Sequence, residues 1–260
     1  MAETGLLAGR RVLVTGATAG LGRVIAEAMA DAGAEVAVHG RNRSRAEEVV
    51  LGIGERGGAA HVVVGDLATG PEGVASIHLA ARSALGSVDI LVNNAADQRP
   101  SLLGAAGWDT WREILGVNLL AAVELTRLVC AGAEDLEGVR VVNVTSVEAR
   151  APFPGHAAYA ASKAALNSFT VSAAKEWAPA RVNAVAAGLT DRPGLPQDWP
   201  QGWSFWAATA PLQRPVKPEE VAAAVVFLAS PLASGITGVT LPVDAGWSSA
   251  ARTPWHRRPE

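Results

Sequence analysis

Short, continuous apolar runs rich in β-branched residues recur along the chain and alternate with longer stretches of helical periodicity. The runs lack the apolar–polar alternation of a half-exposed strand, so each predicts a strand that is buried on both faces. The expected strands are Arg11–Thr15, Glu35–His39, His61–Gly65, Asp89–Asn93, Val139–Thr145, Arg181–Ala186 and Val239–Val243.

The stretches between these runs are amphipathic or rich in alanine. Strands that alternate with helices favour right-handed βαβ crossovers and a parallel sheet covered on both faces. Neither a Ser/Gly linker nor an internal repeat divides the chain, so we expect a single α/β domain over residues 1–250. The expected helices are Leu21–Ala32, Arg43–Leu51, Pro71–Leu85, Trp108–Cys130, Ala157–Trp177 and Pro218–Ala229.

One segment, at about 189–216, interrupts this alternation. It is rich in Pro, Gly and Trp and contains no clear strand. Long irregular insertions in compact domains often act as lids or binding loops, so we expect a lid-like role here. The last residues, 251–260, are predicted to form a flexible C-terminal tail.

Composition excludes several classes of protein. The 260 residues carry a net charge of −3, and 49% of them are apolar, which predicts a large core and no basic surface for nucleic acid. Cys130 is the only cysteine, and the histidines lack metal-ligand spacing, so neither a disulfide nor a bound metal is expected. We find no signal-peptide pattern, and Val221–Ala229 is far shorter than the roughly 20 residues of a membrane span. A cytoplasmic protein without membrane partners is the expectation.

A glycine-rich segment, residues 15–22, follows the first expected strand and leads directly into a helix. Its glycines allow a tight turn and a close ligand approach, while the free N–H groups of the helix start face an anion. An ordinary strand-to-helix connection could have this composition, but the position in a βαβ unit is the one that binds a dinucleotide pyrophosphate. The expected cofactor contacts are Thr15, Gly16, Thr18, Gly20, Leu21 and Gly22.

The end of the second strand indicates which dinucleotide is bound. A carboxylate often lies here to bind the adenosine ribose, but this chain has Arg41, which suits a 2′-phosphate. NADP(H) is therefore favoured over NAD(H), although Arg41 could instead be a solvated residue at a helix start. Asp66, after the third strand, either accepts from the adenine amino group or caps the following turn.

Tyr159, the only tyrosine, precedes Lys163 by four residues in the expected helix Ala157–Trp177. One helical turn places both side chains on one face, where the ammonium favours the phenolate and eases proton transfer. Ser146 ends an apolar strand thirteen residues before Tyr159. This trio is typical of an enzyme.

From about Arg10 to Gly246 the chain resembles the short-chain dehydrogenase/reductase family. Each matching motif is a modest signal, but their shared order and spacing are specific. The resemblance implies a Rossmann-type doubly wound sheet of about seven strands and an NADP-preferring ketoreductase that reduces a ketone, or oxidises the secondary alcohol, by hydride transfer. The motifs are the 15–22 turn, Asp66-Leu67, Asn93-Asn94-Ala95, Val117-Asn118-Leu119, Ser146 after Val142-Asn143-Val144-Thr145, Tyr159-Ala160-Ala161-Ser162-Lys163 and Val243-Asp244-Ala245-Gly246.

The resemblance also implies residue roles. Tyr159 exchanges a proton with the substrate oxygen, Ser146 orients that oxygen, and Lys163 holds the nicotinamide ribose. Asn118 holds a water that connects the lysine to solvent. The resemblance adds further cofactor contacts at Leu67, Asn93, Ala95, Gly188 and Thr190.

Four positions depart from the family pattern, and they touch the nicotinamide side of the pocket more than the catalytic residues. Alanine replaces glycine at Ala96 and Ala245, and replaces proline at Ala187. Arg192 stands where a threonine commonly touches the nicotinamide amide; it either reaches an anionic group or is solvated. Thr190 could partly replace that threonine.

Substrate contacts are expected from loops at the carboxyl ends of the strands. Trp199, Trp203 and Trp206 recur at helical spacing and predict an aromatic stripe, either on a lid over an aromatic or polycyclic ketone or in a packing contact. The other candidates are Asp97, Gln98, Arg99, Ser146, Glu148, Arg150, Phe153, His156, Tyr159 and Arg192.

Two other functions remain open from the sequence. One is non-redox chemistry on the same scaffold, such as elimination, epimerisation or cyclisation of a cyclic or polyketide-like substrate. The other is a cofactor-binding protein without catalysis, which the intact Ser146, Tyr159 and Lys163 disfavour. By resemblance we expect a homodimer or homotetramer formed through helices Trp108–Cys130 and Ala157–Trp177.

Overall fold

Seven parallel strands form one sheet in the order β3-β2-β1-β4-β5-β6-β7. The computed structural model describes residues 5–249. Every strand lies within two residues of its expected range, and the fold class is confirmed. The strands are β1 (Arg11–Val14), β2 (Glu35–Gly40), β3 (Ala59–Val64), β4 (Ile90–Asn93), β5 (Arg140–Ser146), β6 (Arg181–Ala187) and β7 (Thr240–Val243).

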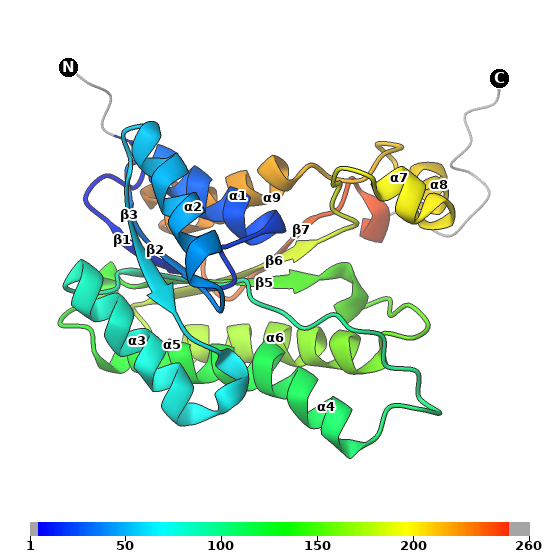
Figure 1. Cartoon of the computed structure of the whole chain (residues 1–260), viewed down its shortest axis with the longest axis horizontal. Helices are drawn as coiled ribbons and strands as arrows, with labels where there is room; N and C mark the ends of the chain where they lie inside the picture. Colours follow the sequence, from blue (N-terminus) through cyan, green and yellow to red (C-terminus); the bar gives the residue numbers. More distant parts are fainter. Residues whose placement is uncertain (1–4, 250–260) are drawn as a thin grey trace.

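Helices cover both faces of the sheet (Figure 1). Because both faces are covered, central strands such as β6 are buried along their whole length, which explains their continuous apolar runs. One layer holds α1 (Gly20–Asp31), α2 (Arg43–Glu55) and α9 (Pro218–Ala229). The other holds α3 (Pro71–Leu85), α4 (Trp108–Leu115), α5 (Ala121–Ala131) and α6 (Ala157–Glu176).

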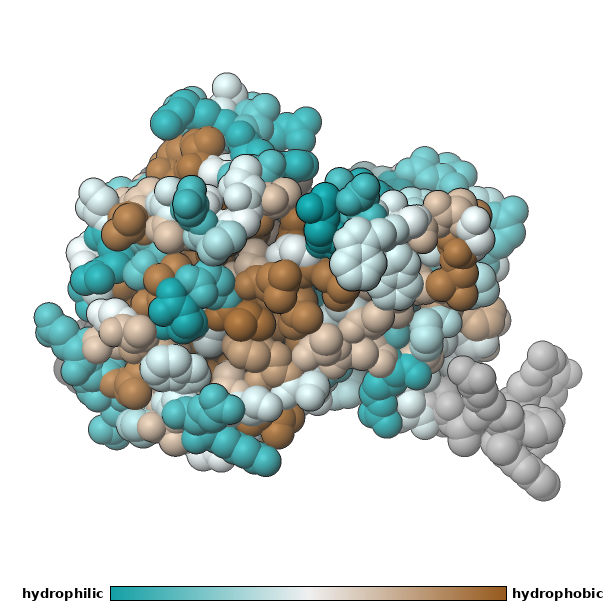
Figure 2. Space-filling view, turned by 90° about the horizontal axis from the view of Figure 1, so that it is seen from below, coloured by the Kyte–Doolittle hydropathy of each residue, from teal (hydrophilic) through white to brown (hydrophobic). Residues whose placement is uncertain are grey.

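The expected helix Trp108–Cys130 is interrupted by a π-helical segment, η2 (Gly116–Leu120). By length and composition alone, the run Trp108–Ala131 could cross a membrane, a test that core helices of soluble proteins also pass. Here α5 packs against α3, and α4 packs against α6. Figure 2 shows apolar side chains gathered on the face that carries these helices.

The insert at 189–216 contains two short helices, α7 (Leu195–Asp198) and α8 (Pro200–Thr209). It has no strand, as expected, and only an isolated bridge joins Thr190 to Val216. Both helices lie at one end of the sheet, apart from the two main layers (Figure 1). The expected tail, 251–260, lies outside the described residues.

The sheet reverses its strand order between β1 and β4. The chain adds β2 and β3 on one side of β1 and then returns to place β4 on the other. Loops leaving two neighbouring parallel strands therefore diverge to opposite faces and open a crevice at the carboxyl edge. The glycine turn follows β1 and Asn94 follows β4, so both line this crevice.

Candidate active site

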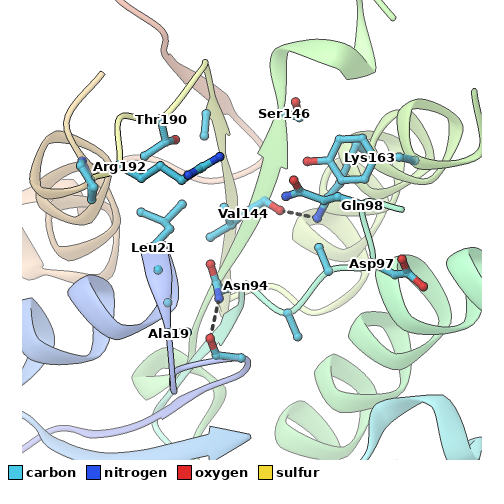
Figure 3. A pocket seen from close by; sticks show the side chains of 18 of the residues that line it. Ala19, Leu21, Asn94, Asp97, Gln98, Val144, Ser146, Lys163, Thr190 and Arg192 are labelled. Carbon is cyan, nitrogen blue, oxygen red and sulfur yellow. Dashed lines mark hydrogen bonds between the residues drawn. The ribbon is translucent and has the colours of Figure 1, made fainter. Parts of the chain in front are cut away.

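A cleft of about 1300 Å³ runs along the carboxyl edge of the sheet. Ser146 and Lys163 lie on one wall, and Leu21, Thr190 and Arg192 lie on the opposite wall (Figure 3). The structure brings most of the sequence-predicted residues together in this one cleft. They are Gly16, Thr18, Gly20, Leu21, Gly22, Arg41, Asp66, Leu67, Ala95, Asp97, Ser146, Glu148, Phe153, Tyr159, Lys163, Gly188, Thr190, Arg192 and Trp206.

The glycine turn has the backbone that the sequence predicts. Gly16 and Gly20 have φ of 64° and 52°, in the left-handed region that favours glycine. At Gly22, an added Cβ would lie 2.1 Å from the carbonyl oxygen of Gly16, so no larger residue fits. The turn therefore keeps its backbone open to a ligand at the start of α1, as a dinucleotide phosphate requires.

Thr15 and Asn94 hold the turn against β4 from behind. The Thr15 hydroxyl donates to the Val92 carbonyl and accepts from the backbone N–H groups of Asn94 and Ala95. The Asn94 amide donates to the Thr15 carbonyl at 2.9 Å, and also to that of Gly16. Thr15 does not line the cleft, so its side chain shapes the cofactor site without facing it.

His39, at the end of β2, is a residue that sequence reasoning missed. Its Nδ1 accepts from the backbone N–H of Gly16 at 3.4 Å, and its Nε2 lies 3.2 Å from the Gly65 carbonyl. Burial lowers the pKa of His39 to about 4. The neutral imidazole therefore ties the glycine turn to the end of β3.

Two arginines flank the end of the cleft next to β2. Arg41 lines it, as predicted, and so does Arg45, one turn into α2. The sequence did not indicate Arg45, because its position depends on where α2 begins. Asn42 sets that point by accepting a hydrogen bond from the Arg45 N–H.

Asp66 caps the turn after β3, as one of its two predicted roles required. Its carboxylate accepts from the backbone N–H of Ala68.

Tyr159 is buried at the start of α6, with Ser146 beside it at the end of β5. Burial raises the pKa of Tyr159 to about 12; the Ser146 hydroxyl opposes this shift, and the Glu148 charge adds to it. Desolvation therefore sets the net direction, and the pKa of Tyr159 lies above its ordinary value, opposite to the shift expected from the Lys163 cation alone. The result is a phenol that keeps its proton until a partner oxygen takes it.

Lys163 is buried beside Tyr159 in the wall of the cleft. Its Nζ lies 5.7 Å from the centre of the phenol ring and donates to the Val144 carbonyl at 2.8 Å. Burial lowers the pKa of Lys163 to about 8. The amine is thus held at the cleft wall as a cation that loses its proton more readily than an exposed lysine.

Asn118 lies in the π-helical segment and does not line the cleft. Its amide donates to the Asp97 carbonyl and the Ser162 hydroxyl, and its oxygen accepts from the Asp97 N–H at 2.7 Å. The side chain therefore joins the loop after β4 to α6. Asn93 is similarly buried: its amide donates to Asn143 rather than facing the cleft.

The wall beyond Tyr159 is formed by the loop after β5. Glu148 is 9% exposed, accepts from the Phe153 N–H and contacts His156 Nδ1 at 3.1 Å. Phe153 packs against Trp247 with ring centres 5.8 Å apart. This part of the cleft therefore combines an aromatic surface with a carboxylate–imidazole pair.

The insert contributes a second aromatic surface, but not as the tryptophan stripe predicts. Trp206 is buried and stacks on Trp247 with ring centres 4.9 Å apart, while Trp199 stands over Gly202 at the cleft edge. Trp203 does not line the cleft, whereas Phe205 does. Because α8 begins at Pro200, after Trp199, the three tryptophans do not share one helical face.

The charged residues at the cleft mouth are paired with one another. Arg192 contacts the Asp198 carboxylate at 2.6 Å, and about half of its side chain stays exposed to solvent at the cleft wall. Asp97 is bonded to Arg99, which lowers the pKa of that carboxyl. Arg99 also contacts Glu113 at 2.9 Å.

The fold and this cleft define an NAD(P)-dependent oxidoreductase of the Rossmann type. A family profile described as enoyl-(acyl carrier protein) reductase matches residues 16–248. The 3-oxoacyl-(acyl-carrier-protein) reductase FabG of Vibrio cholerae is 37% identical over 244 residues, covering 92% of this chain and 98% of that protein. The chain belongs to the short-chain dehydrogenase/reductase family, as its motifs predict.

Two solved structures are also similar. A gluconate 5-dehydrogenase from Burkholderia cenocepacia, in complex with NADP and tartrate, superposes with a TM-score of 0.87 at 29% identity, covering 96% of this chain and all of that one. The angucycline C-6 ketoreductase LanV, with bound NADP, has a TM-score of 0.87 at 29% identity and covers 95% and 98% of the two chains. Both structures therefore share the fold of this chain over nearly all of its length.

Proposed function

We propose that this protein is an NADP(H)-dependent ketone reductase that also oxidises the corresponding secondary alcohol. The convergence of Ser146, Tyr159 and Lys163 on one wall of the cleft carries this proposal. The open glycine turn at the other end gives the cofactor a place to bind. When bound, NADPH supplies the hydride that reduces the carbonyl carbon.

In this proposal Tyr159 donates its proton to the carbonyl oxygen as negative charge develops there. The raised pKa of the buried phenol suits a donor that stays protonated until the oxygen becomes basic. Ser146 orients the same oxygen by a hydrogen bond. Both contacts strengthen as charge develops on the oxygen, so they stabilise the transition state more than the ground state.

Lys163 and Asn118 support that pair. Lys163 holds the nicotinamide ribose and, as a cation, stabilises the tyrosinate left after proton transfer. Asn118 keeps the loop after β4 in place against α6, and by family resemblance its segment binds the water that returns protons to Lys163. Gly188 and Thr190 complete the nicotinamide end, where Thr190 hydrogen-bonds the Gly188 carbonyl.

The preference for NADPH rests on Arg41 and Arg45. Both line the cleft beside the end of β2, where the 2′-phosphate of a bound NADP would lie. No carboxylate stands at the end of this strand to bind the ribose of NAD. The NADP-bound gluconate 5-dehydrogenase and LanV are consistent with this choice.

Three wider expectations belong to the same proposal. Residues 189–216 act as a lid, because α7 and α8 bring Trp199, Phe205 and Trp206 to the cleft. The protein assembles as a homodimer or homotetramer through the apolar face of α4, α5 and α6 (Figure 2). Its location is cytoplasmic.

The test combines binding and turnover. Quenching of the eight tryptophans should report tighter binding of NADPH than of NADH. NADPH oxidation should then be found in a panel of quinones, polyketide-like ketones, steroids and 3-oxoacyl thioesters. Tyr159→Phe should reduce turnover at least about 100-fold while leaving the NADPH dissociation constant unchanged. Full activity in this variant would refute the proton-donor assignment.

A further inference from the structure

Glu148 and His156 form an acid–imidazole pair beside Tyr159 that the reductase chemistry does not use. The His156 Nδ1 lies 3.1 Å and 3.2 Å from the two carboxylate oxygens of Glu148. The His156 and Tyr159 ring centres are 6.1 Å apart, edge to face. All three side chains line the cleft.

The position of His156 at the start of α6 does not explain the pair. His156 is the N-cap residue of α6, but its side chain caps no backbone group. The Ser101 hydroxyl accepts from the Ala158 N–H instead, at 3.2 Å. The imidazole is therefore turned away from the helix start and toward Glu148 and the cleft.

The carboxylate fixes which nitrogen of His156 is exposed to a ligand. A carboxylate accepts, so the facing Nδ1 carries the proton of the neutral ring and Nε2 is left as an acceptor. Within residues 5–249, no protein group forms a hydrogen bond with this Nε2. The cleft thus holds an oriented, unused polar atom next to the proposed proton donor.

The surrounding charges restrict what that atom can bind. At the substrate end, the cleft-lining arginines within the described residues are already bonded to carboxylates: Arg99 to Asp97 and Glu113, and Arg192 to Asp198. Glu148 itself is negative and lies behind the imidazole. Beside His156, an anionic group on the substrate would face the Glu148 carboxylate and arginines that already have carboxylate partners, whereas a hydroxyl would meet an acceptor.

We propose that His156, oriented by Glu148, binds a hydroxyl on the carbon next to the reacting carbonyl, so that the preferred substrates are neutral α-hydroxyketones and their vicinal diols. This inference rests on the proposed reductase function for its catalytic readout. His156 contacts the substrate, and Glu148 acts through His156 as a positioning residue. Phe153 and Phe205, which also line the cleft, add apolar surface for the carbon skeleton.

Matched substrates separate this role from a structural one. NADPH oxidation is measured with 2-hydroxycyclohexanone against cyclohexanone, and with 2-hydroxyacetophenone against acetophenone. We expect the wild-type protein to favour the hydroxyketone of each pair by about tenfold or more in kcat/KM, because a site built to bond a hydroxyl discriminates against the analogue without one. A ratio near one would overturn the proposal.

Two variants test whether the preference for the hydroxyketone depends on the imidazole of His156. His156→Asn keeps a donor near the Nδ1 position for Glu148 but removes Nε2, so it should lose activity on the hydroxyketone alone and bring the ratio near one. His156→Gln, which places a polar atom near Nε2, should restore part of the preference. An equal loss on both members of each pair in His156→Asn would show a purely structural role and overturn the proposal.

A binding measurement keeps the test independent of turnover. Calorimetry compares cis-cyclohexane-1,2-diol with cyclohexanol in the presence of NADPH, with which neither alcohol can react, for the wild type and for His156→Asn. If no ketone is reduced, the reductase proposal fails, but a diol preference that His156→Asn abolishes still supports the hydroxyl site. Equal affinity of the wild type for diol and alcohol would overturn the site whatever the turnover shows.

Discussion

The Lys163 ammonium donates to the Val144 carbonyl at 2.8 Å, in the interior of the protein. Burial removes this ammonium from water, which opposes charging and lowers the pKa of Lys163 to about 8. Proteins retain buried charges mostly where function requires them, and folding stability bears the cost. Lys163 is therefore the residue at which activity and stability should be most clearly opposed.

We expect Lys163→Met to abolish turnover while raising the free energy of unfolding at pH 7 by about 1–3 kcal/mol. The folded protein binds this proton less tightly than the unfolded chain does, so wild-type stability rises as pH increases from about 8 toward the ordinary lysine pKa of 10.5. The advantage of the variant should accordingly shrink over that range. Urea unfolding at several pH values measures it.

Lys175→Met, at an exposed position of the same helix, is the matched control and should change stability little at any pH. A destabilised Lys163→Met protein at pH 7 would show that the hydrogen bond to Val144 outweighs the burial of the charge.

His39 should make the protein sensitive to acid. Its neutral ring accepts from the Gly16 N–H, and burial lowers its pKa from 6.5 to about 4. The stability of the folded state is complete above pH 6.5 and is lost as pH falls toward 4, because the unfolded chain takes up the proton first. Over that window the loss amounts to about 3 kcal/mol. His39→Asn should flatten this part of the stability profile and weaken NADPH binding by loosening the turn.

His61→Asn is the control for this measurement, since His61 is a half-exposed histidine paired with Glu35. If His39→Asn and His61→Asn change the acid profile equally, the acid sensitivity arises elsewhere and the link between His39 and the glycine turn is wrong.

The sheet could be predicted closely because burial on both faces leaves one signature, a continuous apolar run, that depends on no other part of the chain. The π-helical segment could not. Apolar periodicity continues unbroken from Trp108 to Cys130, and the distortion at Asn118 accompanies hydrogen bonds to Asp97 and Ser162, which are distant in sequence. Local patterns carry no information about such partners.

In the site, too, local motifs predicted some residues, while residues that act through distant contacts were not predicted. The residues that line the cleft through motif positions, such as Gly16 and Tyr159, were found. The supporting roles of His39 and Asn94 could not be predicted, because both side chains bond to backbone groups of the glycine turn, which is distant from them in sequence. His39 accepts from the Gly16 N–H, and Asn94 donates to the Thr15 carbonyl. At Ala245, which replaces a family glycine, the backbone keeps a glycine-like φ of 57°, so the motif's shape survives the substitution.

Arg41 and Arg45 should determine the choice of cofactor. Replacing both with alanine removes the two cations beside the 2′-phosphate position, so we expect KM for NADPH to rise at least about tenfold while KM for NADH changes less than about twofold. Added salt should weaken NADPH binding to the wild type more than to the variant. Steady-state kinetics with both cofactors at two ionic strengths measures these effects.

Arg43→Ala is the control, because Arg43 is exposed in the same helical turn and does not line the cleft. Should the double variant lose NADPH and NADH affinity equally, the two arginines support the fold of the site rather than recognise the phosphate.

Trp206 should anchor the lid. It is 2% exposed, stacks on Trp247 and lies so close to Gly188 that an added Cβ there would be 2.7 Å from its ring. Trp247 in turn donates its indole N–H to the Thr209 hydroxyl at the end of α8. Removing the Trp206 ring therefore opens a cavity between the lid and the nicotinamide end. Trp206→Ala should cost about 3–5 kcal/mol in urea unfolding and raise the substrate KM.

Trp203→Ala tests the specificity of that result, because Trp203 lies on the same short helix but does not line the cleft. We expect it to cost less than about 1 kcal/mol and to leave KM unchanged. The decisive comparison is the ratio of KM values at equal NADPH saturation. If Trp206→Ala is destabilised but binds substrate as tightly as the wild type, the segment 189–216 packs against the body without closing over the substrate.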